Sequence, residues 1–140
     1  MLKHFTLEKY INEYHPQWTC PMSEGYLPTD IMVAFEHQFY RLTQFSGSYS
    51  SDDFKTYYEA DSQRSWGDML PLALGLSLID NENKARKNLK LPLFRRYKGI
   101  VALTLNPCDG VVKQTGVHHS HFTWWRTTTF QMSNLKMLHV

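Results

Sequence analysis

The sequence has 140 residues, of which 42% are hydrophobic and 14% aromatic, and this composition excludes a disordered chain and fits one domain spanning residues 1–140. The formal net charge of +2 is unevenly divided: residues 1–82 carry five basic and twelve acidic side chains, and residues 83–140 carry ten basic and one acidic. Such a division predicts that the C-terminal half contacts something anionic.

The first element that the sequence predicts is a short amphipathic helix near the N-terminus. Its apolar stripe has helical spacing and consists of Leu7, Tyr10, Ile11 and Tyr14. Thr6 is suited to cap the helix, and Pro16 ends it by forcing His15 out of helical geometry. Residues 16–28, rich in proline and glycine, are expected to form an irregular loop.

A second, longer helix is predicted over residues 29–45. Thr29 or Asp30 would cap it, and Ser46-Gly47-Ser48 would end it. Its buried face would consist of Met32, Phe35, Phe39 and Leu42.

Two more segments carry helical signals before the chain turns basic. Residues 50–53 suit a helix start because acidic groups favour the positive end of the helix dipole, although a strand over 54–58 is the alternative. Residues 66–79 are apolar on every side, which favours a buried helix beginning near Pro71. Gly75 inside it predicts a close approach by a neighbouring element.

Strand patterns replace helical ones from residue 98 onward. A buried strand is predicted over 98–105, a turn over 106–110, and a returning hairpin strand over 111–115. After Gly116, residues 117–130 favour one long strand rich in aromatic residues and threonine. The last ten residues form either a final strand or a docked tail.

This order of elements predicts an α+β domain, in which N-terminal helices pack on one face of a C-terminal antiparallel sheet of three or more strands. In order and size it resembles the cone of cystatin-like or NTF2-like proteins. That resemblance implies a helix-backed curved sheet and assigns no function.

A basic segment opens the C-terminal half. It holds seven cations within 15 residues, with Phe94 and Tyr97 between them: Lys84, Arg86, Lys87, Lys90, Arg95, Arg96 and Lys98. Cations beside aromatic rings suit an anionic ligand, nucleic acid included. The alternative is that they neutralise the acidic half, within the fold or across a dimer.

The last predicted strand carries the most concentrated chemistry of the chain. Alternation places His119 and His121 on one face, where they would ligate a metal or act as acid and base. The sequence nominates no third ligand, so no metal or cofactor is assigned. His121-Phe122-Thr123 resembles the His-x-Thr tripeptide of two-histidine phosphoesterases. Those enzymes need a second such motif, which we do not expect in this chain, and one tripeptide is common by chance.

Two tryptophans and an arginine follow on the same predicted strand. Trp124 and Trp125 would point to opposite faces, so that one lies in the core and the other is exposed or lines a cavity. With Arg126 and the basic segment, they complete the predicted ligand-binding set.

Other features concern the compartment. Cys20 and Cys108 are too few for a disulfide framework, and we expect two small, reduced, buried side chains. The alternative is one bridge between the N-terminal loop and the hairpin, which would suit an oxidising compartment. The N-terminus lacks a signal-peptide pattern, and the longest apolar stretch is too short to span a bilayer. We therefore expect a soluble, cytoplasmic protein without a membrane partner.

Three functions follow from these observations. The first is a binding module that accepts an anionic or aromatic ligand through the basic half. The second is an accessory protein that binds a protein partner or forms a homodimer. The third is a small hydrolase or phosphodiesterase that uses His119 and His121.

Overall fold

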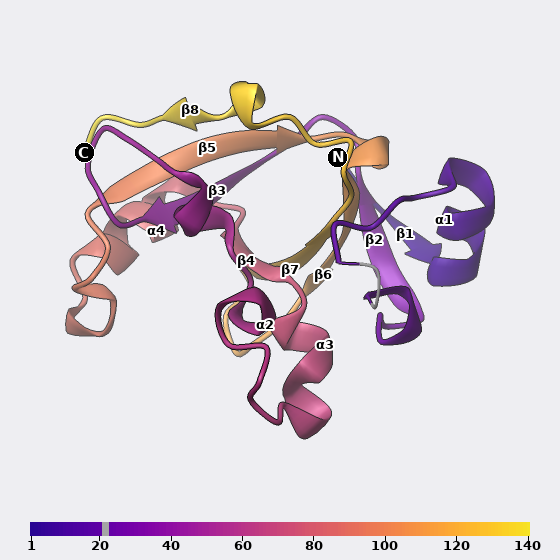
Figure 1. Ribbon diagram of the computed structural model, residues 1–140. Helices are drawn as coiled ribbons and strands as arrows, with labels where there is room; N and C mark the ends of the chain where they lie inside the picture. The colour runs from indigo at the N-terminus through magenta and orange to yellow at the C-terminus, as the bar shows by residue number, and fades with distance from the viewer. Residues whose placement is uncertain (21–22) are drawn as a thin grey trace.

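The computed structural model describes residues 1–20 and 23–140 and has an α+β fold built on a curled antiparallel sheet (Figure 1). Eight strands follow one another in the order β1-β2-β6-β7-β4-β3-β5-β8. Their bounds are Leu2–Thr6 (β1), Asp30–Ala34 (β2), His37–Thr43 (β3), Leu76–Ile79 (β4), Gly99–Leu105 (β5), Gly110–Gln114 (β6), His121–Arg126 (β7) and Lys136–Met137 (β8).

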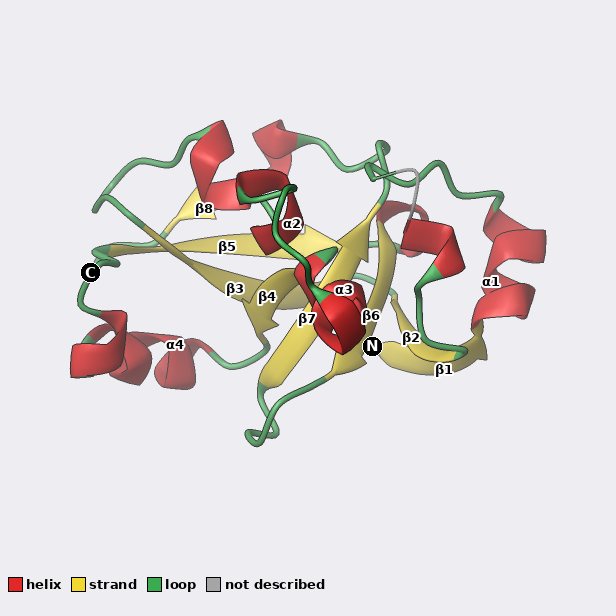
Figure 2. Ribbon diagram, turned by 60° about the horizontal axis from the view of Figure 1, so that its bottom comes forward, coloured by secondary structure: helices red, strands yellow, loops and turns green. Residues whose placement is uncertain are grey.

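The helices are few and short. They are Leu7–Tyr14 (α1), Tyr57–Ala60 (α2), Leu70–Ala73 (α3) and Glu82–Leu89 (α4), and a 3-10 turn, Ser51–Phe54, precedes α2. Figure 2 shows α1 and α4 at opposite ends of the sheet. No helix in the described ranges is long and apolar enough to cross a membrane.

The first predicted helix is confirmed. Thr6 caps α1, and its hydroxyl oxygen accepts a hydrogen bond from the Lys9 amide at 3.1 Å. His15 follows the helix in a left-handed conformation (φ 47°), because Pro16 disfavours the helical region for the residue before it.

The predicted helix over 29–45 is wrong, because this segment forms β2 and β3. The two strands are separated by Phe35 and Glu36, and Glu36 turns the chain with φ of 51°. Most of β3 is buried, and adjacent residues such as Phe39 and Tyr40 are both in the core. A strand with apolar residues on both faces contains positions at helical spacing by accident.

The predicted buried helix over 66–79 is only partly correct. The chain forms the single turn of α3 and then enters β4. Gly75 lies at that transition, where an added Cβ would collide with Thr123 Cγ2 and lie 3.1 Å from Trp125 Nε1. The close approach expected at Gly75 is therefore confirmed, although its partner is β7. Residues 51–60 form the 3-10 turn and α2, not the alternative strand.

The predicted hairpin between residues 98–105 and 111–115 is wrong in its pairing. Both strands exist, but β5 pairs with β3 and β8, whereas β6 pairs with β2 and β7. The turn at 106–110 therefore carries the chain to another part of the sheet. Turn residues specify local backbone geometry and not the partner of the following strand. Cys108 in this turn is exposed and Cys20 is half-buried, both as free thiols, so the expectation that both are buried is wrong.

The long strand predicted over 117–130 is shorter than expected, since β7 begins at His121 and ends at Arg126. Residues 117–120 form turns, so strand alternation does not place His119 on a face with His121. The C-terminal segment docks through β8, which pairs with β5 at Val101 and Ala102.

The core consists of clusters on both faces of the sheet. One gathers Phe39, Leu78, Phe122 and Trp124 with Phe54 from the 3-10 turn. The others involve helices: Tyr10 of α1 packs with Trp125, and Ala85 of α4 packs with Ile100.

Two junctions of the sheet hold a single residue pair each: β2 meets β6 where Met32 lies opposite Val112, and β3 meets β4 at one pair. Strand β3 pairs with β5 along its whole length, His37–Thr43, but meets β4 only where Tyr40 lies opposite Ile79. Beyond that pair, β4 stays on β7 and β3 stays on β5. The sheet therefore splits between β3 and β4.

Candidate functional site

A cavity of about 590 Å³ lies at this split. Its walls come from β3, β4, α2, α4, the segment after α4, and the loop before β7. The lining residues are Arg41, Leu42, Tyr57, Ser77, Ile79, Lys84, Asn88, Leu91, Leu93, Phe94, Arg96, Tyr97, His118, Ser120 and His121. Arg41, Tyr57 and Arg96 also line an adjoining hollow of about 300 Å³.

Arg41 bridges the split. Its Nη1 donates to the Ser77 carbonyl of β4 at 2.7 Å, and its Nε donates to the Asp53 carbonyl at 2.7 Å. The guanidinium thus replaces strand pairing that β3 does not supply at this point. Burial lowers the pKa of Arg41 to about 10, so the group stays charged at neutral pH.

Arg126 holds the same 3-10 turn from β7. Its Nη2 donates to the Phe54 carbonyl at 2.9 Å, next to the carbonyl that Arg41 contacts. Its Nε is buried without a hydrogen-bond partner among the described residues, and burial lowers the pKa of this guanidinium. Arg126 does not line the cavity, so the structure gives it a role in anchoring the turn.

Arg96 forms the second cationic part of the wall, together with two tyrosines. Its Nη2 donates to the Tyr97 hydroxyl at 2.7 Å, and its guanidinium carbon lies 4.8 Å from the Tyr97 ring centroid. Hydrogen bonding to Tyr97 is the main cause that raises the pKa of Arg96, with a smaller contribution from Tyr57. Tyr57 is 57% exposed and stands at the N-terminal end of α2.

Histidines form the wall contributed by β7 and the preceding loop. His121 Nδ1 lies 3.0 Å from the Thr115 carbonyl and donates to it, which in the neutral ring leaves Nε2 as the acceptor nitrogen. His118 and Ser120 also line the cavity, whereas His119 does not. His119 Nδ1 instead lies 3.3 Å from Gln114 Nε2.

The wall is cationic and apolar at once. Arg41, Lys84 and Arg96 supply positive charge, and the described lining contains no carboxylate. Five aliphatic or aromatic side chains supply apolar surface, namely Leu42, Ile79, Leu91, Leu93 and Phe94. Such a wall is suited to bind a molecule that combines an anionic group with an apolar or aromatic body.

The predicted basic set divides between cavity and surface. Lys84 and Arg96 line the cavity. Arg86 forms an ion pair with Glu82 at 2.8 Å and donates to the His139 carbonyl. The remaining cations are exposed and lie outside the lining: Lys87, Lys90, Arg95 and Lys98.

The expectation that one tryptophan is exposed or lines a cavity is wrong. Trp124 is 0% exposed and Trp125 is 1% exposed. Trp124 Nε1 donates to the Asp109 carbonyl, and Trp125 Nε1 donates to the Pro71 carbonyl. Because both indoles are satisfied within the core, neither forms a stacking platform for a ligand.

The structure gives no geometric support to the catalytic and metal-binding hypotheses for His119 and His121. Among the described residues, no three His, Cys, Asp or Glu side chains gather as a metal site requires. The expectation that the chain lacks a second His-x-Thr tripeptide is wrong, because His4-Phe5-Thr6 lies on β1. Strand register places His4 on the face of Trp124, opposite to that of His121, so the two tripeptides do not share a site.

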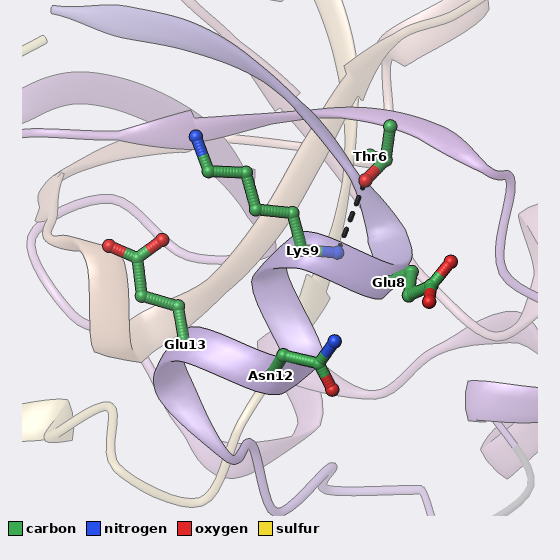
Figure 3. A pocket seen from close by; sticks show the side chains of 5 residues that line it. All are labelled: Thr6, Glu8, Lys9, Asn12 and Glu13. Carbon is green, nitrogen blue, oxygen red and sulfur yellow. Dashed lines mark hydrogen bonds between the residues drawn. The ribbon is translucent and has the colours of Figure 1, made fainter.

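A second hollow lies against α1, away from the split (Figure 3). Its volume is about 470 Å³, and it is lined by Thr6, Glu8, Lys9, Asn12 and Glu13. Two carboxylates and one amine without an apolar wall give it no preference for an anionic ligand.

Sequence reasoning missed Arg41, Tyr57 and the histidine at 118. The signal for Arg41 was present, since this cation is flanked by Phe39, Tyr40 and Leu42, all of which are buried. A cation in a strand that is buried on both faces requires internal partners. In the predicted helix over 29–45, Arg41 lay outside the buried face and was therefore expected to face solvent.

Comparisons of this chain with protein-family models, curated proteins and solved structures find no match.

Proposed function

We propose that residues 1–140 act as one domain that binds a small anionic ligand with an apolar or aromatic body in the cavity between β3 and β4. The observation that supports this proposal best is the composition of the wall, in which Arg41, Lys84 and Arg96 stand beside apolar side chains without a lining carboxylate. A volume of about 590 Å³ suits a small molecule.

Each part of the wall has a distinct task in this proposal. Arg96 and Lys84 supply charge-assisted hydrogen bonds to the anionic group, while Phe94 and Leu42 cover the apolar body. Arg41 contributes positive charge from the inner wall, and its bonds to Ser77 and Asp53 keep its position fixed. His121 offers an acceptor nitrogen for a ligand donor.

The expected setting of this function is the reducing cytoplasm, which the two free thiols, Cys20 and Cys108, suit. We further expect the helices to gather on one face of the sheet, as in a cystatin-like cone. The nucleic-acid form of the hypothesis is the case in which the anionic group is a phosphate and the body is a base.

The test compares two fluorescent probes that share one ring system. The anionic probe is 8-anilinonaphthalene-1-sulfonate, and the neutral probe is N-phenyl-1-naphthylamine. The intact chain is expected to bind the sulfonate more tightly, by about tenfold, because a charged hydrogen bond adds affinity. Titration of each probe gives the ratio of the two dissociation constants.

Variants decide whether the cavity is responsible. Arg96→Gln and Lys84→Gln are expected to reduce the preference for the sulfonate, whereas Lys87→Gln, on the same helix as Lys84 but outside the lining, should preserve it. Equal affinity for both probes in the intact chain, or an unchanged preference in both cavity variants, would overturn the proposal.

A further inference from the structure

The two most exposed large apolar side chains of the described residues flank the same cavity. Val117 is 93% exposed and Leu93 is 83% exposed. Leu93 lines the cavity, and Val117 directly precedes His118, which lines it from the β6–β7 loop. Single exposed apolar residues are ordinary on protein surfaces, but one of these two lines the cavity and the other is next in sequence to a residue that lines it.

Exposed cations lie before and after Leu93 in the chain. Five exposed basic side chains lie on α4 and the segment that follows it: Lys87, Lys90, Arg95, Arg96 and Lys98. The sequence contains no acidic residue between Glu82 and Asp109, and Glu82 is already paired with Arg86. Among the described residues none of these five cations forms an ion pair, so the segment around Leu93 carries unneutralised positive charge.

We propose that the segment 87–98 and the β6–β7 loop dock together on an anionic lipid surface. Leu93 and Val117 would enter the interface between head groups and acyl chains, and Lys87, Lys90 and Arg95 would contact the acidic head groups. This mode of binding needs no membrane-spanning helix, and it would replace the expectation, drawn from the sequence, of a protein without a membrane partner.

Aliphatic tips distinguish this partner from a nucleic acid. Base stacking requires aromatic or guanidinium planes, and neither Leu93 nor Val117 provides one. An anionic lipid surface, in contrast, rewards both the buried aliphatic area and the surrounding cations. The inference goes beyond the proposed ligand site, because Val117, Lys87, Lys90 and Arg95 do not line the cavity.

The experiment is co-sedimentation of the intact chain with lipid vesicles. One set contains phosphatidylcholine alone, and the other contains about 30 mol% phosphatidylserine, an anionic content suited to surface attraction. The chain should sediment with the anionic vesicles and not with the neutral ones, and added salt should release it.

Three variants test the named contacts. Val117→Asn and Leu93→Asn should each weaken vesicle binding about tenfold by removing inserted apolar area. Lys90→Gln should weaken it about fivefold by removing one head-group contact. Met69→Asn is the matched control and should leave binding unchanged, because Met69 is 57% exposed but lies in the 3-10 turn Gly67–Met69, outside both docking segments.

Several results would overturn this inference. They are the absence of sedimentation with anionic vesicles at low salt, equal sedimentation with neutral vesicles, and unchanged binding in both Val117→Asn and Leu93→Asn. A dimer that the two variants convert to a monomer would assign this face to a second copy of the chain and would also overturn it.

The two proposals fail separately. Val117→Asn should retain the affinity of the intact chain for 8-anilinonaphthalene-1-sulfonate, which also shows that the variant is folded. If the intact chain binds the probe but not the anionic vesicles, the lipid inference alone is overturned. If the intact chain binds the anionic vesicles but not the probe, the proposed ligand site alone is overturned.

Discussion

Strand β3 is joined to its two neighbouring strands in different ways. On one edge, β5 satisfies the backbone of β3 from His37 to Thr43. On the other edge, β4 contributes the single pair of Tyr40 and Ile79, and the Arg41 side chain then bonds to the Ser77 carbonyl. The cavity therefore lies where a side chain, and not a strand ladder, connects the two strands.

The largest expected effect breaks the paired edge. Phe39 is fully buried on β3, and its ring centroid lies 5.4 Å from that of Phe122. Phe39→Ala should lower the free energy of unfolding by about 3–5 kcal/mol, because it leaves a cavity in the core. Urea denaturation measures this change, and a loss below about 1 kcal/mol would contradict the assigned core.

The next effect breaks the split edge. Arg41→Met retains a long side chain but removes the donors to the Asp53 and Ser77 carbonyls. The free energy of unfolding should fall by about 2–3 kcal/mol, since two carbonyls lose charged hydrogen bonds. Arg95→Met is the control, because Arg95 is exposed. Equal stability of the two variants would show that Arg41 does not bridge the strands.

Amide hydrogen exchange would sharpen the comparison without a mutation. Amides of β3 that point toward β5 should exchange at least about tenfold more slowly than those that point toward β4 beyond Tyr40, because only the former are held in a strand ladder. Uniform protection along both edges would mean that the sheet is closed at this junction.

The smallest effect concerns the pH dependence of stability that arises from His37, the first residue of β3. Burial is the main cause that lowers the pKa of His37, so the folded chain binds this proton less tightly than the unfolded chain does. The free energy of unfolding should therefore fall as the pH decreases from about 6.5 through the folded-state pKa. In His37→Gln this part of the pH dependence should be lost, whereas His4→Gln, at an exposed position, should retain it. Urea denaturation at several pH values provides the comparison.

Local signals were sufficient for part of the fold. Thr6 and Pro16 delimit α1, the apolar run at 99–105 forms β5, and Gly75 meets a close neighbour. Each of these features depends on residues close together in the chain or on a steric limit at one position. The α+β class, in contrast, was predicted from an order of elements in which the helix over 29–45 was wrong and the helix over 66–79 only partly correct.

Pairing and burial were not predictable in the same way. The segment 29–45 fits a helix by periodicity, and only its partners β1, β5 and β6 make it two strands. For the same reason the sequence could not show that Trp125 is covered by Tyr10 and its neighbours, or that Arg41 and Arg96 face one cavity. Lys84 and Arg96 were predicted from charge alone, and of the seven predicted cations they are the two that line the cavity.

The most direct test of the central claim is to locate bound probe by nuclear magnetic resonance. Backbone amide shifts would be followed while 8-anilinonaphthalene-1-sulfonate is added to the intact chain. We predict that the largest shifts occur around the split, at Tyr57, Lys84, Arg96 and His121. Largest shifts at the α1 hollow around Lys9 and Glu13, or shifts spread evenly over the surface, would contradict the assignment of the ligand site to the split between β3 and β4.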